Sequence, residues 1–256
     1  MILINMAKIL TQKEEQKRFS IYQPELPFPD WNQTVSARYG HGTRYDILVP
    51  TELQITEGMP MPQKVKVQDP LLPYNGIVPN GLTGFNVARS LYNKGIAIVD
   101  GIHFYLYDNI FSCLLNSPVT YTAMLMNVAC TISTDFSVYM NWTEHDKRQS
   151  VWRNQTLERL WRYNGISVIT NVSWAGPDSY TYCFQFIPKH DIIAINSMGI
   201  KGDPDAVYFW HKGYDYVISH LEPKLILRYG DKMDGENETI SRYFTNPVIE
   251  RLHNGR

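Results

Sequence analysis

Two aspartates of the sequence stand directly after apolar segments, where a carboxylate can take part in chemistry. Asp108 follows the apolar run 101–107, and Asp135 follows the apolar run 126–132. A carboxylate in such a place can exchange a proton with a substrate or ligate a metal ion. We therefore predict Asp135 as a catalytic acid or base with Asp108 as its partner. The competing interpretation is that Asp135 only caps the turn or helix that follows it.

A third apolar run, 166–169, is followed by residues suited to ligand binding. Asn171, Ser173 and Trp174 stand just beyond it. A tryptophan at the edge of a site can stack on a base or a sugar, but it can equally close a hydrophobic core. We predict all three residues as ligand-binding, with the core position of Trp174 as the alternative.

Two further apolar runs end in the same manner. Ser197 and Gly199 follow the run 192–195, and Tyr229 follows the run 225–227. The serine can form a polar floor, and the glycine can expose backbone N–H groups to an anion. We predict these three residues as ligand-binding, although an isolated glycine is more often a turn residue.

Basic residues gather in the segment 144–164, and on a helix they could bind phosphate groups. They are Lys147, Arg148, Arg153, Arg159 and Arg162. We include Arg153 and Arg159 among the predicted ligand-binding residues. The alternative is a solvated face that pairs with acidic residues of the same segment. Those residues are Glu144, Asp146 and Glu158.

No motif predicts a metal site or identifies a cofactor. The histidines lack His-Glu-x-x-His and His-x-His spacing, and the chain has no Gly-x-Gly-x-x-Gly, no Walker lysine and no Gly-x-Ser-x-Gly. A metal triad assembled from separate strands, such as His103 with Asp108 and Asp135, stays open as an alternative. The cofactor is therefore unknown, and we predict no metal ligands.

Composition and charge limit the classes of function. The chain has 24 Lys and Arg against 25 Asp and Glu, a net charge of −1, which gives no global attraction to nucleic acid or to an anionic membrane. The chain has three cysteines, which are far apart: Cys113, Cys130 and Cys183. Their odd number and wide spacing predict no disulfide framework and favour a cytoplasmic location. We expect core positions for Cys130 and Cys183. No stretch approaches the ~18–20 apolar residues that cross a bilayer.

The candidate residues need elements to position them, and from Gly81 onward the sequence pattern becomes regular. Thr83 is a candidate cap for a short helix. The segment 144–164 is the clearest helix, with Thr143 as N-cap, and 206–221 is a second long helix. The apolar runs described above read as buried parallel strands between the helices.

Alternating strands and helices predict an α/β fold with parallel strand pairing. We expect a (β/α)-barrel-like fold, irregular or incomplete, with an open doubly wound parallel sheet as the alternative. Residues 1–80 are predicted as an irregular proline-rich N-terminal arm packed on the main domain, with extended pieces near 46–49 and 64–67. Residues 81–256 are predicted to form the barrel-like domain.

Five short motifs occur in a fixed order between about residues 96 and 230. They are His103-Phe-Tyr-Leu-Tyr-Asp108, Asp135-Phe-Ser137, Val172-Ser-Trp174, Ser197-Met-Gly199 and Tyr229-Gly230. The series resembles an uncharacterised domain-of-unknown-function family that is common in bacteriophages, plasmids and other bacterial mobile elements. The chain departs from it at Thr134, where the family often has proline, and at Thr170-Asn171, where it often has Ile-Pro. The resemblance implies a mobile-element origin and a cytoplasmic setting, and it implies no established activity.

Three functional hypotheses follow. The first is a phage or mobile-element protein that binds a nucleic acid, a nucleotide or a host or phage protein at the rim of strand carboxyl ends. That rim would comprise Asp108, Asp135, Trp174, Ser197 and Tyr229. The second is a hydrolase-type enzyme at the same rim. The third is a structural or assembly protein, to which the proline-rich arm and the 13% aromatic content would contribute. None involves a membrane, and the oligomeric state is left open.

Overall fold

The computed structural model of the chain describes residues 52–54, 64–66 and 71–245. Strands β1 (Glu52–Gln54) and β2 (Lys64–Lys66) pair antiparallel in a small sheet of their own. Strand β2 lies in the extended piece predicted near 64–67, whereas the piece predicted near 46–49 lies outside the described residues.

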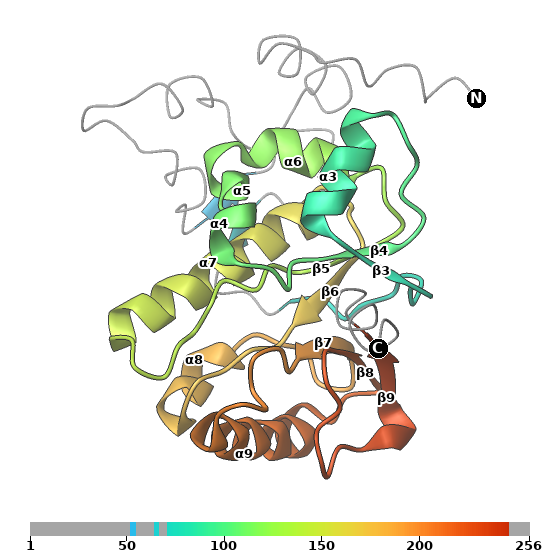
Figure 1. Cartoon of the computed structure of the whole chain (residues 1–256). Helices are drawn as coiled ribbons and strands as arrows, with labels where there is room; N and C mark the ends of the chain where they lie inside the picture. Colours follow the sequence, from blue (N-terminus) through green and yellow to red (C-terminus); the bar gives the residue numbers. More distant parts are fainter. Residues whose placement is uncertain (1–51, 55–63, 67–70, 246–256) are drawn as a thin grey trace.

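The main sheet has seven strands, and every neighbouring pair is parallel. In spatial order they are β3 (Leu82–Gly84), β4 (Gly101–His103), β5 (Thr131–Ile132), β6 (Val168–Asn171), β7 (Ile192–Asn196), β8 (Leu225–Tyr229) and β9 (Ser241–Phe244). The sheet curls into an open half-barrel (Figure 1). The barrel-like, incomplete α/β fold is confirmed. The doubly wound alternative is wrong, because its strand order would reverse at a switch point and this order follows the chain.

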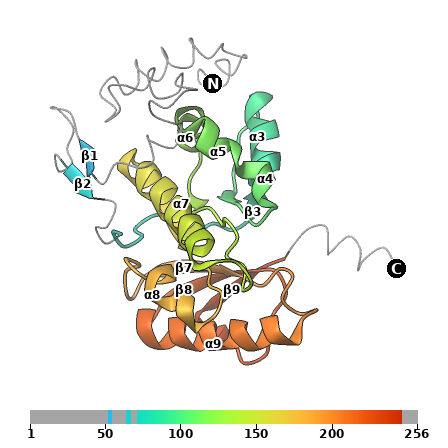
Figure 2. The same cartoon turned by 90° about the vertical axis from the view of Figure 1, so that its left-hand side faces the viewer.

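Helices cover the outer, convex side of the sheet (Figures 1 and 2). They are α3 (Phe85–Asn93), α4 (Asp108–Phe111), α5 (Cys113–Asn116), α6 (Pro118–Leu125), α7 (Glu144–Tyr163), α8 (Tyr180–Cys183) and α9 (Pro204–Leu221), with 3-10 turns η3 (Pro177–Ser179) and η4 (Glu238–Ile240). Among the described residues, no helix is both long and apolar enough to span a membrane.

The two long helices form where the sequence predicts them. The Thr143 hydroxyl accepts a hydrogen bond from the Asp146 N–H at the start of α7, and Gly165 follows the helix with φ of 76°. Helix α9 begins two residues before the predicted start, because the Asp203 carboxylate accepts from the N–H groups of Asp205 and Ala206.

Three local predictions are wrong at their boundaries. Thr83 lies in β3 and donates to the Asp100 carboxylate, so it caps no helix, and α3 begins after Gly84. The run 126–132 is a strand only at Thr131–Ile132, since the part before it follows directly on α6. The run 101–107 is a strand only at Gly101–His103, because the chain then turns into α4.

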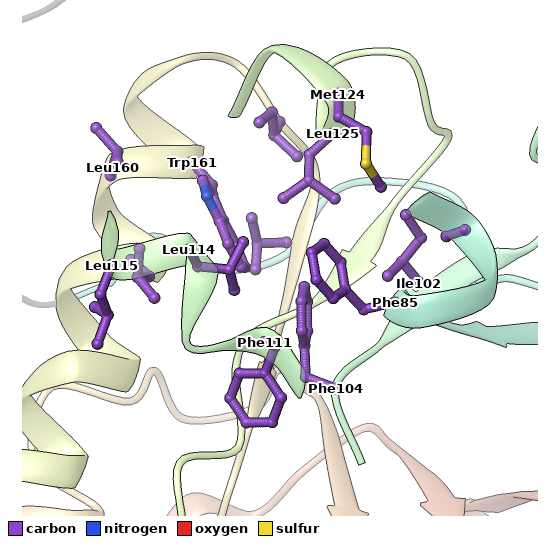
Figure 3. Packing of buried hydrophobic residues seen from close by; sticks show 14 of the residues in the cluster. Phe85, Ile102, Phe104, Phe111, Leu114, Leu115, Met124, Leu125, Leu160 and Trp161 are labelled. Carbon is purple, nitrogen blue, oxygen red and sulfur yellow. The ribbon is translucent and has the colours of Figure 1, made fainter. Parts of the chain in front are cut away.

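A helix-side core rich in aromatic residues lies between the sheet and the helices α3 to α7 (Figure 3). The ring of Phe104, which follows β4, lies 5.1 Å from the ring of Phe85 and 5.4 Å from that of Trp161. All three side chains are fully buried. A second core joins α8 and α9 to β7 and β8, and Cys183 belongs to it. Cys130 is buried as well, so both cysteines predicted as core thiols are confirmed.

The concave face of the half-barrel carries a third core, which includes Ile132, Ile169 and Leu227. The segment 71–80 contributes Tyr74 to it. The Tyr74 N–H donates to both carboxylate oxygens of Asp191, at 2.8 and 2.9 Å, just before β7. These residues therefore pack on the main sheet. The predicted division at residue 80 stays a prediction.

Candidate functional site

Polar and aromatic side chains gather on the concave face at the carboxyl ends of the strands. Side chains two residues apart on a strand share a face. Because Ile169, Ala194 and Leu227 belong to the concave core, the residues two positions further on point to the same side. We call the resulting set the carboxyl-end group: His103, Tyr105, Asp135, Asn171, Asn196 and Tyr229.

Asp135 is at the centre of this group. Its Oδ1 accepts a hydrogen bond from Asn171 Nδ2 at 2.7 Å, and its Oδ2 accepts one from Asn196 Nδ2 at 2.6 Å. The Ser173 hydroxyl is a further hydrogen-bond donor to this carboxyl group. Residues at the ends of β6 and β7 thus converge on one partly exposed carboxylate that follows β5.

The two asparagine amides are fixed in orientation by their other contacts. Asn171 Oδ1 accepts from the Tyr105 hydroxyl at 3.1 Å. Asn196 Oδ1 accepts from the Met198 N–H at 3.0 Å. Because each amide oxygen already faces a donor, each amide nitrogen is directed toward Asp135.

Asp108 supports the same loop from the start of α4. Its Oδ1 accepts from the Ser137 hydroxyl at 2.9 Å, and its Oδ2 accepts from the Ser137 N–H at 3.2 Å. Asp108 therefore holds the chain two residues beyond Asp135 and places a second negative charge near it.

The environment disfavours the charged form of Asp135. Burial raises its pKa from 3.8 to about 6, hydrogen bonds from Asn171, Ser173 and Asn196 oppose this, and the charge of Asp108 reinforces it. A carboxyl group that titrates near neutral pH can act as an acid or a base. The arrangement is therefore chemically competent for both hydrogen bonding and proton transfer.

The aromatic members of the group contribute no positive charge at pH 7. The His103 ring lies 4.4 Å from that of Tyr229 and 5.4 Å from that of Tyr105, and burial lowers the histidine pKa to about 4. Burial also raises the pKa of Tyr229 to about 12. His103 is buried in the barrel lining, as a histidine inside a strand can be.

The structure brings together five of the predicted site residues: Asp108, Asp135, Asn171, Ser173 and Tyr229. Three members of the group were not among the predicted catalytic or ligand-binding residues: His103, Tyr105 and Asn196. Asn196 follows an apolar run directly and so carries the same signal as Asn171. Tyr105 is signalled only by its two-residue spacing from His103.

Three other predicted residues make contacts elsewhere. The Trp174 indole N–H donates to the Phe209 carbonyl of α9, and its ring packs in the core around that helix. The Ser197 hydroxyl donates to the Asp231 carbonyl. Gly199 is an exposed turn residue with φ of 76°. Their ligand-binding roles stay predictions, and they are not part of the carboxyl-end group.

The two predicted arginines lie on α7 against other parts of the chain. Arg153 donates to Gln149 Oε1 at 3.0 Å and lies 5.7 Å from the Phe136 ring. Arg159 is buried, with its guanidinium 5.3 Å from the Phe186 ring. Their predicted ligand-binding roles are untested.

Acidic residues of α7 pair with two of its other arginines, but only the Arg148–Glu144 pair is solvated as the alternative interpretation expects, because Glu158 and Arg162 are largely buried. Arg148 forms an ion pair with Glu144 at 2.7 Å, and Arg162 forms one with Glu158 at 2.9 Å.

The described part of the chain shows no metal triad. Within residues 52–54, 64–66 and 71–245, no three His, Cys, Asp or Glu side chains are grouped so as to hold a metal ion. The three side chains of the alternative triad, His103, Asp108 and Asp135, form no such group.

Comparison with known proteins places the chain among phage proteins. A family model described as "Domain of unknown function (DUF4417)" matches residues 61–246. The Gene 1 protein of Mycobacterium phage L5 is 30% identical over 155 residues, which are 60% of this chain and 66% of that protein. The Gene 1 protein of Mycobacterium phage D29 is 29% identical over 177 residues, which are 67% of this chain and 63% of that protein. The chain thus spans just under two thirds of these relatives. No solved structure matches it.

Proposed function

The chain belongs to the DUF4417 family, whose function is unknown, and from this premise we propose that it is a ligand-binding phage protein of the host cytoplasm. The binding site is the carboxyl-end group, with Asp135 as the residue that contacts the ligand. One observation carries the proposal: amides from two different strands each hold one oxygen of this carboxylate at the carboxyl edge of a parallel sheet. In folds of this class, that edge is where ligands bind.

The geometry around Asp135 favours a ligand that donates hydrogen bonds to its carboxylate. Each Asp135 oxygen accepts one bond from an asparagine and keeps further acceptor capacity, and the side chain is partly exposed. Ser173 and Asn196, beside it, are also partly exposed. A ligand that enters here meets an acceptor whose position is already fixed, so binding loses little side-chain entropy.

Charge distinguishes between the three predicted ligand classes, which are nucleic acid, nucleotide and protein. The hydrogen bonds to Asp135 come from neutral side chains, and the second carboxylate, Asp108, adds a negative charge. A nucleic-acid backbone or a nucleotide phosphate would be repelled by two carboxylates. Of the three classes, a protein segment with N–H donors fits best, and the edge of a nucleobase comes second.

The test is a thermal-shift screen of the full chain with spermidine, arginine amide, guanosine and adenosine. At least one compound should raise the melting temperature of the wild type and leave that of Asp135→Asn unchanged. Asp215→Asn, which changes an exposed aspartate of α9 outside the group and outside the loops that follow the strands, is the matched control and should respond like the wild type. Shifts that persist in Asp135→Asn would contradict the proposal.

A second function, hydrolase-type catalysis at the same group, is supported by the pKa of Asp135. Burial raises that pKa to about 6, which suits a general acid or base near neutral pH. The assay is hydrolysis of p-nitrophenyl acetate and p-nitrophenyl phosphate between pH 5 and 8. Catalysis should show an inflection near pH 6 in the wild type and none in Asp135→Asn. Equal rates in both proteins would refute a catalytic role for Asp135 with these substrates.

A further inference from the structure

The loops that follow five successive strands form one surface beside the carboxyl-end group. They are residues 104–108, 133–143, 172–179, 197–203 and 230–237, which follow β4, β5, β6, β7 and β8. We call this surface the loop face. Because parallel strands end at the same edge of a sheet, the loop face surrounds Asp135.

Negative charge is concentrated on the loop face. The whole chain is nearly balanced, with 25 acidic and 24 basic residues. The five loops contain seven acidic residues and two lysines: Asp108, Asp135, Asp178, Asp203, Asp231, Asp234, Glu236, Lys201 and Lys232. The local net charge is therefore −5 when every carboxylate is ionised.

Part of this charge is compensated within the molecule. Lys147 forms an ion pair with Asp178, and Arg228 forms a buried ion pair with Glu236. When these two acidic residues are set aside, five acidic residues stand against two lysines. The loop face thus keeps an acidic excess, and Asp108 and Asp135 lie within it.

Large apolar and aromatic side chains are exposed on the same loops. Tyr107 is 82% exposed, Tyr139 53%, Met140 42% and Met198 39%. Exposed apolar side chains grouped with polar ones are typical of interaction sites, and tyrosine and methionine are enriched there.

One hydrogen bond and two sequence relations connect these side chains with the carboxyl-end group and with Asp108. Tyr107 directly precedes Asp108, and Met198 donates its N–H to Asn196. Tyr139 follows Ser137, the residue held by Asp108, by two positions. Exposed apolar side chains therefore lie on the loops that carry Asp108 and Asp135 and on the loop that follows Asn196.

We propose that the loop face docks a protein segment in which an arginine is flanked by apolar residues. The guanidinium binds Asp135, and the flanking residues pack on Tyr107, Tyr139 and Met140. The two carboxylate oxygens, each held by one asparagine, match the two parallel N–H donors of a guanidinium. Tyrosine faces bind guanidinium groups as well. This inference rests on the proposed binding function and names the partner chemistry.

The experiment begins with a random peptide library panned on the full-length protein. Enriched peptides should contain arginine next to apolar residues. The best of them is then labelled, and its affinity is compared by fluorescence polarisation with that of the same peptide carrying neutral citrulline instead of arginine. The citrulline peptide should bind at least about tenfold more weakly, because it loses the charge-assisted bond.

Variants separate this inference from the proposed function. The double variant Tyr107→Ala, Tyr139→Ala should bind the arginine peptide at least about tenfold more weakly than the wild type does. Truncating a tyrosine at the centre of an interface often costs this much affinity. Tyr208→Ala removes a tyrosine that is 56% exposed on α9, outside the loop face, and should change nothing. Circular dichroism confirms that each variant is folded.

Each alternative outcome has a defined meaning. If Asp135→Asn loses the peptide while the double variant keeps it, the binding site stands and the loop-face proposal fails. If both variants bind like the wild type, the proposed function fails for this ligand as well. No enriched peptide, enriched peptides without arginine, or tighter binding of a labelled 20-nucleotide single strand would each overturn the inference.

Discussion

Replacing Asp135 with asparagine should change how the stability of the protein depends on pH. Burial, reinforced by Asp108, raises the pKa of Asp135 from 3.8 to about 6, so the folded state binds the proton more tightly than the unfolded state does. The proton on Asp135 therefore stabilises the folded state fully below pH 3.8, and this stabilisation is lost as the pH rises through 6. One pKa unit corresponds to about 1.4 kcal/mol, so the complete loss is about 3 kcal/mol, of which about 2 kcal/mol falls between pH 4 and 8.

The assay is urea unfolding followed by tryptophan fluorescence at each pH from 4 to 8. The quantity of interest is the difference in free energy of unfolding between Asp135→Asn and the wild type. It should change by about 2 kcal/mol in favour of the variant as the pH rises. The asparagine also turns an N–H group toward Asn171 or Asn196, but that cost does not depend on pH and cancels from the change.

Two further variants make the result specific to this carboxylate. Asp234→Asn alters an exposed aspartate, and its difference from the wild type should stay constant within about 0.5 kcal/mol. Asp108→Asn removes the charge that reinforces the shift, so the pKa of Asp135 should fall and the pH dependence should shrink. A difference between Asp135→Asn and the wild type that stays constant from pH 4 to 8 would refute the electrostatic reasoning.

Three other substitutions test the packing and the charges. Gly213→Ala would place a Cβ 2.0 Å from Trp174 Nε1, so the indole must move, and the urea midpoint should show a loss of about 1–3 kcal/mol. Glu236→Gln leaves the Arg228 guanidinium, 1% exposed, without its charged partner and should cost about 3–5 kcal/mol in the same assay. Burial lowers the pKa of His103 to about 4, so the stability of the wild type relative to that of His103→Gln should fall by about 3 kcal/mol as the pH drops from 6.5 through 4.

Each of the three has a matched control. Gly202→Ala adds a Cβ with no atom within 4 Å and should be close to neutral. Glu238→Gln breaks an ion pair with Lys232 in which both side chains are more than half exposed, so little stability should be lost. His220→Gln alters an exposed histidine, and its stability relative to the wild type should not change over this pH range. A control that loses as much stability as its partner variant would contradict the corresponding explanation.

Local signals in the sequence were sufficient for the two long helices and for the class of sheet. The Thr143 cap and the glycine after α7 are residues whose effect needs no distant contact. Strand lengths were harder, because an apolar run does not reveal where a helix ends and a strand begins. The run 126–132 shows this, since only its last two residues form β5.

The site was predictable in outline but not in its contacts. Asp135 and Asn171 were found because residues after parallel strands meet at one edge. Asn196 carries the same signal as Asn171, but only the packed structure shows that its amide reaches Asp135 from two strands away. Trp174 packs on α9 because Gly213 has no side chain there, a fact that only the packed structure contains. The assembly role predicted for the proline-rich arm concerns mainly residues outside the described part and stays a prediction.

The sequential strand order has a consequence for how the protein is made. Every pair of neighbouring strands is also consecutive in the chain, so the sheet can grow one strand at a time as the chain leaves the ribosome. The bond between Tyr74 and Asp191 differs, because it joins residues 117 positions apart. The segment 71–80 is therefore synthesised early but reaches this contact only after β7 begins. Until then the concave core lacks Tyr74 and stays incomplete, so its apolar residues are more accessible to chaperones and to aggregation than in the folded protein.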